Sequence, residues 1–396
     1  MKILLVYPSP FSNVFFRSFI EGFVQAGHEV AVCTGRAGGE CDAFGALPAG
    51  TVTYEVDLPR GAAVRAHLGA VHGVRDAVRR FQPDIVHAHM SAAVFTTAIA
   101  RQWQNTTIGT FHGLMYPLRT GLARSVIGVA ERTAMKRLDQ VQVVNRSDYN
   151  VVRRDCPRAN CVVLRAGFGT DLRKFNPAAF DADARAAIRR EIGLRPDAVV
   201  GAFVGRMVEF KGIPTLVRAF RRVVAQQRGA QLLIVGSTDP LHPTGLTPDE
   251  DCWLRHTNAI RITGFTDSPE RYLSAADYFV LPSVREGLST AIMEALCMGL
   301  PVVTTAARGC SDLVENGRTG LVVPPGDVPA LEAALLETIV CPEGRRRQGE
   351  RALAHRARLG RDECVREMID IYQRLEARRE AIHASSMDPI PVRTRL

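Results

Sequence analysis

Short apolar runs alternate with amphipathic segments along most of the chain. The run Lys2–Tyr7 is followed by Asn13–Ala26, whose aromatic and aliphatic residues recur at helical spacing, and then by the run Glu29–Thr34. This pattern predicts a strand, a helix and a second strand. Further elements are expected as strands at Ile85–His89, Thr107–Phe111 and Gln140–Val144, and as helices at Arg60–Phe81 and near Gly121–Leu138. Such an order predicts a parallel sheet that is covered by helices on both faces.

The alternation stops at the turn-rich segment Gly167–Pro177 and the polar, Ala-rich segment Ala178–Arg190, which we interpret as a connector. It restarts with six expected strands: Ala198–Val204, Leu232–Val235, Ile260–Thr263, Tyr278–Leu281, Pro301–Thr304 and Leu321–Val323. We therefore predict an α/β fold with two doubly wound, Rossmann-like domains at residues 1–175 and 190–358, divided somewhere between 170 and 197. A C-terminal helix within 361–380 is expected to pack back on the first domain, and residues 381–396 are expected to form a disordered tail.

The composition places the chain among ordinary globular proteins. Of its 396 residues, 46% are hydrophobic and 23% are charged, which argues against a disordered or coiled-coil protein. No uncharged apolar run is long enough to span a membrane, and the first residues lack the features of a signal peptide. The nine cysteines are scattered without a CxxC pair, which disfavours a zinc site or a disulfide framework and fits a reducing cytoplasm.

The net charge of +9 is concentrated in the first domain. Residues 1–170 hold 19 Lys and Arg against 12 Asp and Glu, whereas residues 171–396 hold 31 against 29. An anionic partner is expected for the first domain, with nucleic acid and a membrane surface as the two candidates at this point. Only four of the 50 basic residues are lysines, so a lysine here can mark a position where a compact ammonium is preferred to a guanidinium.

Two segments of the second domain carry residues suited to binding phosphate and sugar. In VGRMVEFKG (Val204–Gly212), Arg206 and Lys211 follow a predicted strand, with Gly205 opening the turn, and they precede a helix N-terminus. Two cations beside free backbone N–H groups can hold a diphosphate, although surface cations on a loop are the alternative.

The second segment, PSVREGLSTAIMEALCMG, also joins a strand to a helix. Glu286 lies in its loop and can accept hydrogen bonds from sugar hydroxyls, and Glu294 lies in the helix, either on a solvated face or beside a bound polyol. The amides at the start of this helix are candidates for binding phosphate, and they belong to Gly287, Leu288, Ser289 and Thr290.

Three histidines fall at predicted strand ends in the first domain. His87 and His89 alternate along one strand and are expected to be structural, whereas His112, followed by glycine, is the better candidate for a ligand contact. The Asp181-Ala-Asp183 sequence matches a metal-binding DxD pattern but is better explained as a helix cap. The sequence lacks GxGxxG at the first strand, a Walker A sequence and GxSxG, which disfavours a dehydrogenase, a P-loop phosphotransferase and a serine hydrolase.

Together these segments resemble the family-4 glycosyltransferases, which are retaining enzymes of the GT-B fold, with two domains facing a central cleft. The matching pieces are, in order, PDIVHAH (Pro83–His89), TFHG (Thr110–Gly113), GFGTDLRKFNP (Gly167–Pro177), VGRMVEFKG (Val204–Gly212), ITGFT (Ile262–Thr266), EGLSTAIMEALCMGLPVVTT (Glu286–Thr305) and NGRTGLVVPPGD (Asn316–Asp327). The ordered set is far more specific than any one piece. Within the family the chain looks most like bacterial surface-polysaccharide transferases.

The resemblance implies roles for the residues at matching positions. Arg206 and Lys211 would hold the donor diphosphate and stabilise charge on the leaving nucleoside diphosphate. Glu286 would contact the donor sugar, and Glu294, eight residues on, the ribose hydroxyls. The amides of Leu288, Ser289 and Thr290 would contact the distal phosphate and the sugar. Gly264 and Phe265 would lie by the base, and His112 would approach the sugar. No metal or other cofactor is implied, because the two cations and the helix dipole supply the electrostatic stabilisation.

The resemblance also bears on the acceptor. It implies a saccharide or polyprenyl-linked acceptor bound by the first domain, and no nucleic-acid partner. Basic residues of that domain form two groups, one of Arg60, Arg65, Arg75, Arg79 and Arg80 and the other of Arg119, Arg124, Arg132, Lys136 and Arg137. We expect one group to dock on anionic lipid at the inner face of the cell membrane, the alternative being a solvated basic face.

In one place the chain departs from the family pattern. Many relatives have a Gly-Gly loop after the first strand, where this chain has Pro8–Asn13. Three alternatives to a transferase stay open: a GT-B epimerase, a GT-B phosphorylase with a pyridoxal cofactor, and a catalytically silent scaffold of a polysaccharide assembly complex.

Overall fold

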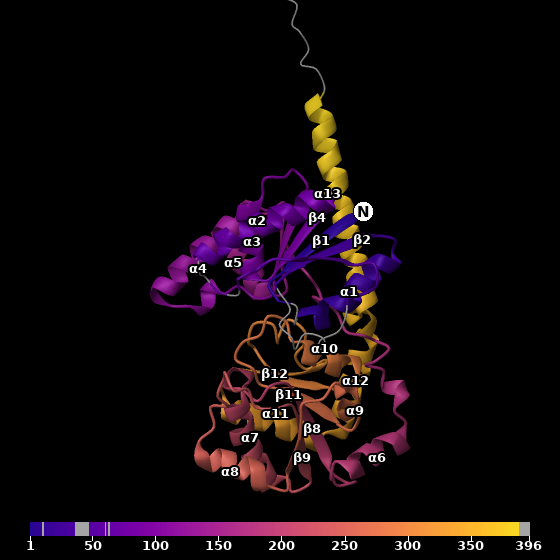
Figure 1. Ribbon diagram of the computed structural model, residues 1–396. Coiled ribbons are helices and arrows are strands. Elements are labelled where there is room, and N and C mark those ends of the chain that lie inside the picture. Colours follow the sequence, from indigo (N-terminus) through magenta and orange to yellow (C-terminus); the bar gives the residue numbers. More distant parts are fainter. Residues whose placement is uncertain (10–11, 36–46, 60, 62–63, 388–396) are drawn as a thin grey trace, which may run out of the picture. The chain divides into compact units, whose positions relative to one another are not determined.

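The computed structural model describes residues 1–9, 12–35, 47–59, 61 and 64–387, and the chain divides into two compact units (Figure 1). Unit 1 comprises Met1–Val143, Asp148–Leu164 and the chain from Asp362 onward, and unit 2 comprises Val144–Ser147 and Arg165–Arg361. Each unit is built on its own parallel sheet and has its own hydrophobic core. Within the described ranges, no helix is long and apolar enough to cross a membrane.

Unit 1 contains a seven-stranded parallel sheet with the order β3-β2-β1-β4-β5-β6-β7. Its strands are β1 (Lys2–Tyr7), β2 (Glu29–Thr34), β3 (Val52–Glu55), β4 (Ile85–His89), β5 (Thr106–Phe111), β6 (Gln140–Val143) and β7 (Cys161–Val163). Strand β1 is almost entirely apolar, and β4 and β5, although they include histidine and threonine, are buried along their whole length because helices cover both faces of the sheet. Along β1, Leu4 and Val6 enter one core cluster, whereas Tyr7 stacks on Phe16 of α1 with ring centroids 4.3 Å apart.

The helices of unit 1 are α1 (Asn13–Gln25), α2 (Val64–Phe81), α3 (Ser91–Ala100), α4 (Gly121–Met135), α5 (Arg146–Asp155) and α13 (Arg361–Met387). In Figure 1 the strands lie between α2, α3 and α4 on one side and α1 and α13 on the other. The last helix thus completes the layer that α1 begins. Its Tyr372 is fully buried, and its hydroxyl lies 2.6 Å from Nδ1 of His87 on β4.

Unit 2 contains a six-stranded parallel sheet with the order β10-β9-β8-β11-β12-β13. Its strands are β8 (Val199–Val204), β9 (Ala230–Val235), β10 (Ile260–Gly264), β11 (Tyr278–Leu281), β12 (Val302–Thr305) and β13 (Gly320–Val323). This is the doubly wound arrangement predicted from the sequence, and each predicted strand lies within two residues of its observed bounds. The sheet carries the carboxyl ends of all six strands to one edge.

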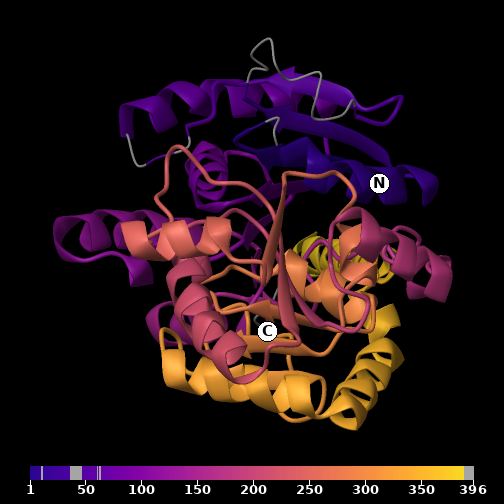
Figure 2. The same cartoon turned by 90° about the horizontal axis from the view of Figure 1, so that it is seen from below.

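The helices of unit 2 are α6 (Ala182–Glu191), α7 (Ile213–Gln226), α8 (Pro248–His256), α9 (Pro269–Ser274), α10 (Thr290–Cys297), α11 (Val328–Val340) and α12 (Pro342–Ala354). Figure 1 shows the strands between α7, α8 and α11 on one side and α6, α9 and α12 on the other. Figure 2 shows α11 and α12 following one another along the border of the unit. Pro342 begins α12 directly after Cys341, the C-cap of α11, which separates the two helices.

The division between the units lies earlier than the sequence predicts. Unit 2 takes in the whole segment from Arg165, so the predicted limits at 175 and 190 are wrong. Phe175 is buried in the core of unit 2, and Thr170 pairs with the backbone on both sides of Gly360. The predicted connector is helix α6, which begins with Asp181 accepting a hydrogen bond from the Ala184 amide at 2.8 Å, as the capping interpretation predicts.

The C-terminal helix is longer than expected. Helix α13 runs to Met387, so the expected disordered tail is wrong for residues 381–387. The sequence from Arg374 to Met387 contains neither Gly nor Pro and is rich in Ala, Glu and Arg, which favour a helix. Residues 388–396 lie outside the described residues, as do Arg60 of the first basic group and Pro10 and Phe11 of the loop after β1.

Candidate functional site

The strand order of unit 2 changes direction between β8 and β11. Strands β9 and β10 follow β8 in sequence and lie on one side of it in the sheet, whereas β11, β12 and β13 lie on its other side. Ligands of open parallel sheets bind outside the carboxyl ends of the strands at such a switch point. Arg206 and Lys211 follow β8 and Glu286 follows β11, so the predicted residues lie where this topology favours a ligand.

An ion pair between Lys211 and Glu286 joins the two loops at the switch point. Nζ of Lys211 lies 2.8 Å from Oε1 of Glu286, and the side chains are only 17% and 13% exposed. The hydroxyl of Ser283 donates to the same carboxylate oxygen at 2.9 Å. An ammonium has three N–H groups and a carboxylate about four acceptor sites, so both groups retain hydrogen-bonding capacity for a ligand.

The approach of these two loops depends on Gly212. Its φ of +79° lies in the left-handed region, and a Cβ at this position would lie 2.0 Å from the carbonyl oxygen of Pro282. Only glycine permits both the conformation and the contact. The amide of Val284 also donates to the carbonyl oxygen of Phe210 at 3.0 Å. Backbone contact therefore determines how close Lys211 lies to Glu286.

Arg206 is held by a residue that the sequence analysis missed. Its guanidinium forms an ion pair with Asp239, in the segment after β9, and lies 5.7 Å from the centroid of the Phe210 ring. Nδ1 of His242 is 3.2 Å from the same carboxylate. Asp239 comes four residues after a buried strand, and that position at the carboxyl edge of the sheet is the signal that could have identified it. With 52% of its side chain exposed, Arg206 keeps donors for other partners.

The start of α10 is capped by one of the residues that were predicted to bind phosphate. The Ser289 amide donates to the carbonyl oxygen of Gly309 at 3.0 Å, and its hydroxyl accepts from the Ile292 amide at 3.4 Å. Ser289 is thus a helix cap, and a phosphate would have to compete with the Gly309 carbonyl oxygen for its amide, so phosphate binding by Ser289 stays a prediction. The first-turn amides of Thr290 and Ala291 have no partner inside the helix, and with the loop amides of Gly287 and Leu288 they are the more accessible candidates for binding an anion.

Glu294 lies in α10, and its carboxyl group is a weaker acid than an ordinary glutamate. Burial raises the pKa of Glu294 to about 7, in opposition to the charges of Lys174 and Arg361, which lower it. Lys174 is itself engaged, since its Nζ lies 3.6 Å from Oε2 of Glu270. Hydrogen-bond donors of a ligand favour the ionised form of such a carboxyl group.

Gly264 and Phe265 mark the carboxyl end of β10. Gly264 has a φ of +78°, and the Phe265 side chain after it is 79% exposed. An aromatic ring so exposed at the ligand-binding edge offers a face on which a planar base can stack.

His112 lies in unit 1, after β5, beside a second histidine. Its Nε2 is 3.2 Å from Nδ1 of His89, and burial lowers the pKa of His112 to about 4. His87 is hydrogen-bonded to Tyr372 and, through Nε2 at 2.7 Å, to Thr110, and burial lowers its pKa to about 3. His87 and His89 are fully and almost fully buried, as expected of structural residues, and all three histidines are neutral at pH 7.

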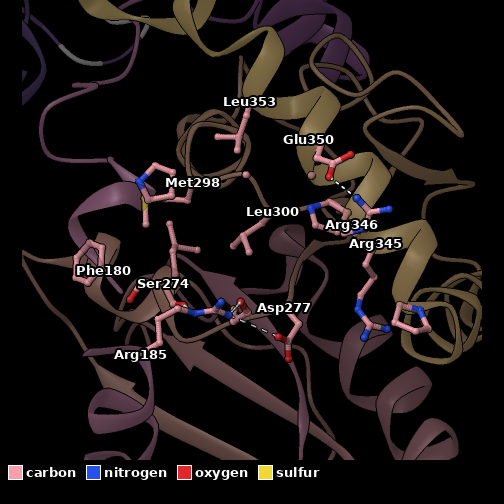
Figure 3. A pocket seen from close by; sticks show the side chains of 17 residues that line it. Phe180, Arg185, Ser274, Asp277, Met298, Leu300, Arg345, Arg346, Glu350 and Leu353 are labelled. Carbon is pink, nitrogen blue, oxygen red and sulfur yellow. Dashed lines mark hydrogen bonds and ion pairs between the residues drawn. The ribbon is translucent and has the colours of Figure 1, made fainter. Parts of the chain in front are cut away.

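A cavity of about 430 Å³ lies at the opposite edge of the sheet of unit 2, near the amino ends of β11 and β12 (Figure 3). Its cations are occupied by the protein. Arg185 donates to the carbonyl oxygen of Ser274, Arg345 to that of Thr338, and Arg346 pairs with Glu350 at 2.7 Å. This cavity contains none of the predicted site residues, and we assign no ligand to it.

Comparison with known proteins identifies the family to which the chain is similar. Residues 12–172 match the family model described as Glycosyltransferase Family 4, and residues 198–340 match that described as Glycosyl transferases group 1. Over 243 residues the chain is 28% identical to the capsular polysaccharide biosynthesis glycosyltransferase CapM of Staphylococcus aureus, a match that covers 60% of this chain and 62% of CapM. It is 29% identical over 317 residues to D-inositol 3-phosphate glycosyltransferase 2 of Catenulispora acidiphila, covering 74% and 70% of the two chains.

Solved structures show the same architecture. Sucrose-phosphate synthase from Thermosynechococcus elongatus matches with a TM-score of 0.80 at 22% identity, covering 95% of this chain and 99% of the other. Anabaena HepE, solved in complex with UDP-glucose, matches with a TM-score of 0.74 at 18% identity, covering 94% and 99%. The two Rossmann-like domains and these structural neighbours identify the GT-B fold. The chain belongs to the family-4 glycosyltransferases.

Proposed function

We propose that this chain is a retaining glycosyltransferase that moves a sugar from a nucleoside diphosphate sugar to a saccharide or polyprenyl-linked acceptor during synthesis of a bacterial surface polysaccharide. The observation that carries the proposal is the Lys211–Glu286 pair at the switch point between β8 and β11. Lys211, which would bind phosphate, and Glu286, which would accept hydrogen bonds from sugar hydroxyls, lie 2.8 Å apart. HepE with its UDP-glucose and the capsular polysaccharide role in the name of CapM support the choice of donor and pathway.

The donor diphosphate would be held by Lys211, Arg206 and the first amides of α10. Both cations have carboxylate partners, Glu286 and Asp239, so a diphosphate would exchange with or add to these ion pairs. Negative charge grows on the leaving diphosphate during transfer, and cations fixed beforehand stabilise that charge at little reorganisation cost. This is the main rate effect that we assign to the site.

The remaining donor contacts follow from position. Glu286 would accept hydrogen bonds from the sugar, Glu294 from the ribose hydroxyls, and Gly264 and Phe265 would lie against the base. His112 would contribute from unit 1 a neutral imidazole, able to donate or accept one hydrogen bond to the sugar.

Retention of configuration would arise without a protein nucleophile. The bond to the departing diphosphate would loosen first, and the acceptor hydroxyl would then attack the same face of the sugar. The hydroxyl proton would pass to the departing phosphate oxygen, which becomes more basic as its bond to the sugar breaks. The role of the chain is therefore to bind, orient and stabilise charge.

The positive charges of Arg206 and Lys211 would replace a metal at the diphosphate. Activity that is unchanged by a chelator such as EDTA is the expected result. Activity that is lost with EDTA and restored by Mg²⁺ or Mn²⁺ would overturn metal independence while leaving the rest of the proposal in place.

The acceptor would be reached at a membrane surface, and the two basic groups differ in their suitability. On α2, Arg79 and Arg80 pair with Asp76, and Arg75 donates to the carbonyl oxygen of Ala100. In the second group, Arg119, Arg124 and Lys136 are exposed, whereas Arg137 donates to the carbonyl oxygens of Ala98 and Arg101 and so belongs to the fold. The second group is therefore the better candidate for peripheral contact with anionic lipid.

A hydrolysis screen with UDP-, GDP- and ADP-sugars tests the proposal. Slow release of one nucleoside diphosphate, lost in Lys211→Ala, is the expected result. Saturation-transfer NMR that detects no binding of UDP or GDP would favour a silent scaffold. Conversion of the nucleotide-sugar to its epimer would favour an epimerase, and an absorbing pyridoxal group would favour a phosphorylase.

A further inference from the structure

Helix α4 in unit 1 has an apolar strip on its exposed face. Leu122, Val126 and Val129 recur at spacings of four and three residues, so they lie along one side of the helix, and they are 80%, 43% and 59% exposed. Leu118, in the turn just before α4, is 38% exposed. Figure 1 shows α4 at the periphery of unit 1, beside α3 and α5. Apolar side chains gathered in this way indicate a surface that another apolar phase covers.

The charge around the apolar strip is positive. Arg119 and Arg124 are exposed near its start and Lys136 is exposed just beyond its end. The only acidic residue within Gly121–Met135 is Glu131, which is 2% exposed and accepts hydrogen bonds from the hydroxyl of Ser91 and the amides of Met115 and Tyr116. The outer surface of α4 therefore combines apolar residues with exposed cations, a combination that suits an anionic lipid surface.

A pocket of about 430 Å³ opens beside the apolar strip. Its lining residues are Tyr116, Arg124, Ser125, Arg132, Arg154 and Asp155. Three guanidinium groups thus share a cavity with one carboxylate, which pairs with Arg154 at 2.7 Å and accepts a hydrogen bond from the buried Tyr116 hydroxyl. The excess positive charge is of the kind that binds a phosphoryl group, because guanidinium groups match phosphate oxygens in pairs.

The position of Arg132 in this pocket depends on a glycine. The Arg132 guanidinium lies 5.4 Å from the centroid of the Tyr116 ring and crosses the helix surface at Gly128, where a Cβ would come within 2.9 Å of its Nη1. Glycine inside a helix costs about 1 kcal/mol relative to alanine. Gly128 therefore gives the Arg132 guanidinium room to lie across the helix surface, and a Cβ at this position would displace it.

We propose that this pocket binds the phosphoryl headgroup of an anionic membrane lipid while the apolar strip enters the lipid phase beside it. The inference rests on the proposed function, because it concerns the surface at which a lipid-linked acceptor would be met. It adds to that function a specific site, formed by Arg124, Arg132 and Arg154, and a lipid class, one with an accessible phosphate monoester. Such a headgroup carries more charge than a phosphodiester and exposes more oxygens to the three guanidinium groups.

Vesicle sedimentation of the full chain tests the proposal. Phosphatidylcholine vesicles are compared with vesicles that contain phosphatidic acid or phosphatidylglycerol at equal total surface charge. Tighter binding to phosphatidic acid is expected. Arg124→Gln and Gly128→Ala should each weaken it about five- to tenfold and abolish the preference. Gly128→Ala favours the helix, so its loss of binding cannot be caused by unfolding. Arg65→Gln, on an exposed cation of α2, is the matched control and should bind like the wild type.

The apolar strip is tested by Leu122→Ser combined with Val129→Ser, which should weaken binding to every anionic vesicle by at least about tenfold. Hydrolysis of the nucleotide-sugar is also measured for each variant without vesicles, and its rate should not change. Vesicle binding therefore tests this inference and hydrolysis tests the proposed function, so that the failure of one can be distinguished from the failure of the other. Binding that follows total charge alone and ignores Gly128→Ala would overturn the pocket. Binding of glycerol 3-phosphate without vesicle binding, or self-association that depends on Leu122 and Val129, would overturn docking to lipid.

Discussion

At the scale of single residues, the site couples each cation to a carboxylate. Lys211 has Glu286 and Arg206 has Asp239 as partners, so neither cation is left uncompensated in a partly buried position. The carboxylates also restrict the cations to one place, which is the condition for electrostatic stabilisation of a developing charge.

Lys211→Ala should therefore lower kcat about 10²- to 10³-fold, or roughly 3–4 kcal/mol in activation free energy, because it removes a fixed cation from the diphosphate. Steady-state donor hydrolysis measures the effect, with circular dichroism to verify folding. Lys2→Ala is a suitable control, since it removes a lysine that pairs with Glu29 at 3.6 Å on the surface of unit 1. Lys174→Ala is not suitable, because Lys174 lies beside Glu270 and its charge acts on Glu294. Similar losses in Lys211→Ala and Lys2→Ala would exclude the phosphate role.

Glu294 provides a prediction about pH. Its carboxyl group has a pKa of about 7 in the folded chain, so the ionised form needed to accept ribose hydroxyls grows as the pH rises toward neutrality. The donor kcat/KM should fall on the acid side of about pH 7, and Glu294→Gln should remove this acid limb and raise the donor KM. A profile with the same acid limb in both proteins would exclude Glu294 as its source.

The same group predicts a pH dependence of stability with a definite sign. The pKa of Glu294 in the folded chain is raised above its ordinary value of 4.5, so the folded state retains a proton that the unfolded chain releases. The stabilising contribution is complete below about pH 4.5 and is lost as the pH rises through about 7, with a limit of about 3 kcal/mol. Urea unfolding of wild type and Glu294→Gln should show the wild type losing stability relative to the variant over this interval. A difference that stays constant with pH would contradict the raised pKa.

At the scale of elements, the loops after β8 and β11 are brought together by backbone contact. Gly212→Ala and Gly326→Ala form a matched pair, because both glycines have a φ near +76° to +79° but a Cβ at Gly326 meets nothing within 4 Å. Both variants should lose about 1–2 kcal/mol from the left-handed conformation. Gly212→Ala should lose a further ~1–3 kcal/mol from the clash with Pro282 and should also lose donor affinity. Chemical unfolding and UDP titration measure the two effects, and equal behaviour of the pair would show that the contact is unimportant.

Elements that are buried on both faces could be predicted from the sequence, and peripheral ones could not. Strands such as β1 and β11 are continuous apolar runs, which identify a strand between two helical layers. The edge strands β3 and β7 were not predicted, because they are only four and three residues long and neither contains a fully buried residue. The site residues that follow buried strands were found for the same reason. The position of Asp239 after a buried strand could have made it a candidate, but its ion pair with Arg206 joins two loops and cannot be inferred from the sequence, and the use of the Ser289 amide depends on Gly309, twenty residues away.

At the scale of the whole molecule, the chain passes from unit 1 through unit 2 and returns to unit 1 in α13. The apolar pattern could show that two sheets exist, but it could not show where one unit ends. That boundary depends on which core receives Phe175, and on the pairing of Thr170 with the backbone around Gly360. Such contacts join segments far apart in the sequence.

This return of the chain makes the stability of unit 1 dependent on its last helix. A chain ending at Arg361 keeps every residue of unit 2 but removes α13. It therefore loses the buried side chains of Tyr372 and Met368. It also loses Glu376, whose carboxylate accepts a hydrogen bond from the Thr106 hydroxyl. Each large apolar side chain of α13 contributes about 1.5–3 kcal/mol by burial, and several of them together approach the total stability of an ordinary domain. Unit 1 should therefore unfold in the shortened chain, whereas unit 2 should remain folded and bind UDP.

Hydrogen exchange by mass spectrometry distinguishes the two units in one experiment. In the chain ending at Arg361, amides of β1, β4 and β5 should exchange as in an unfolded chain, while amides of β8, β9 and β11 should stay protected and gain protection with UDP. A chain ending at Glu380 retains Tyr372, Met368 and Glu376 and should behave like the wild type, which separates loss of the packed part of α13 from loss of chain length. Protection of β1 and β4 in the shorter chain would show that unit 1 folds without α13. Loss of protection in both units would show that the packing of α13 also supports unit 2.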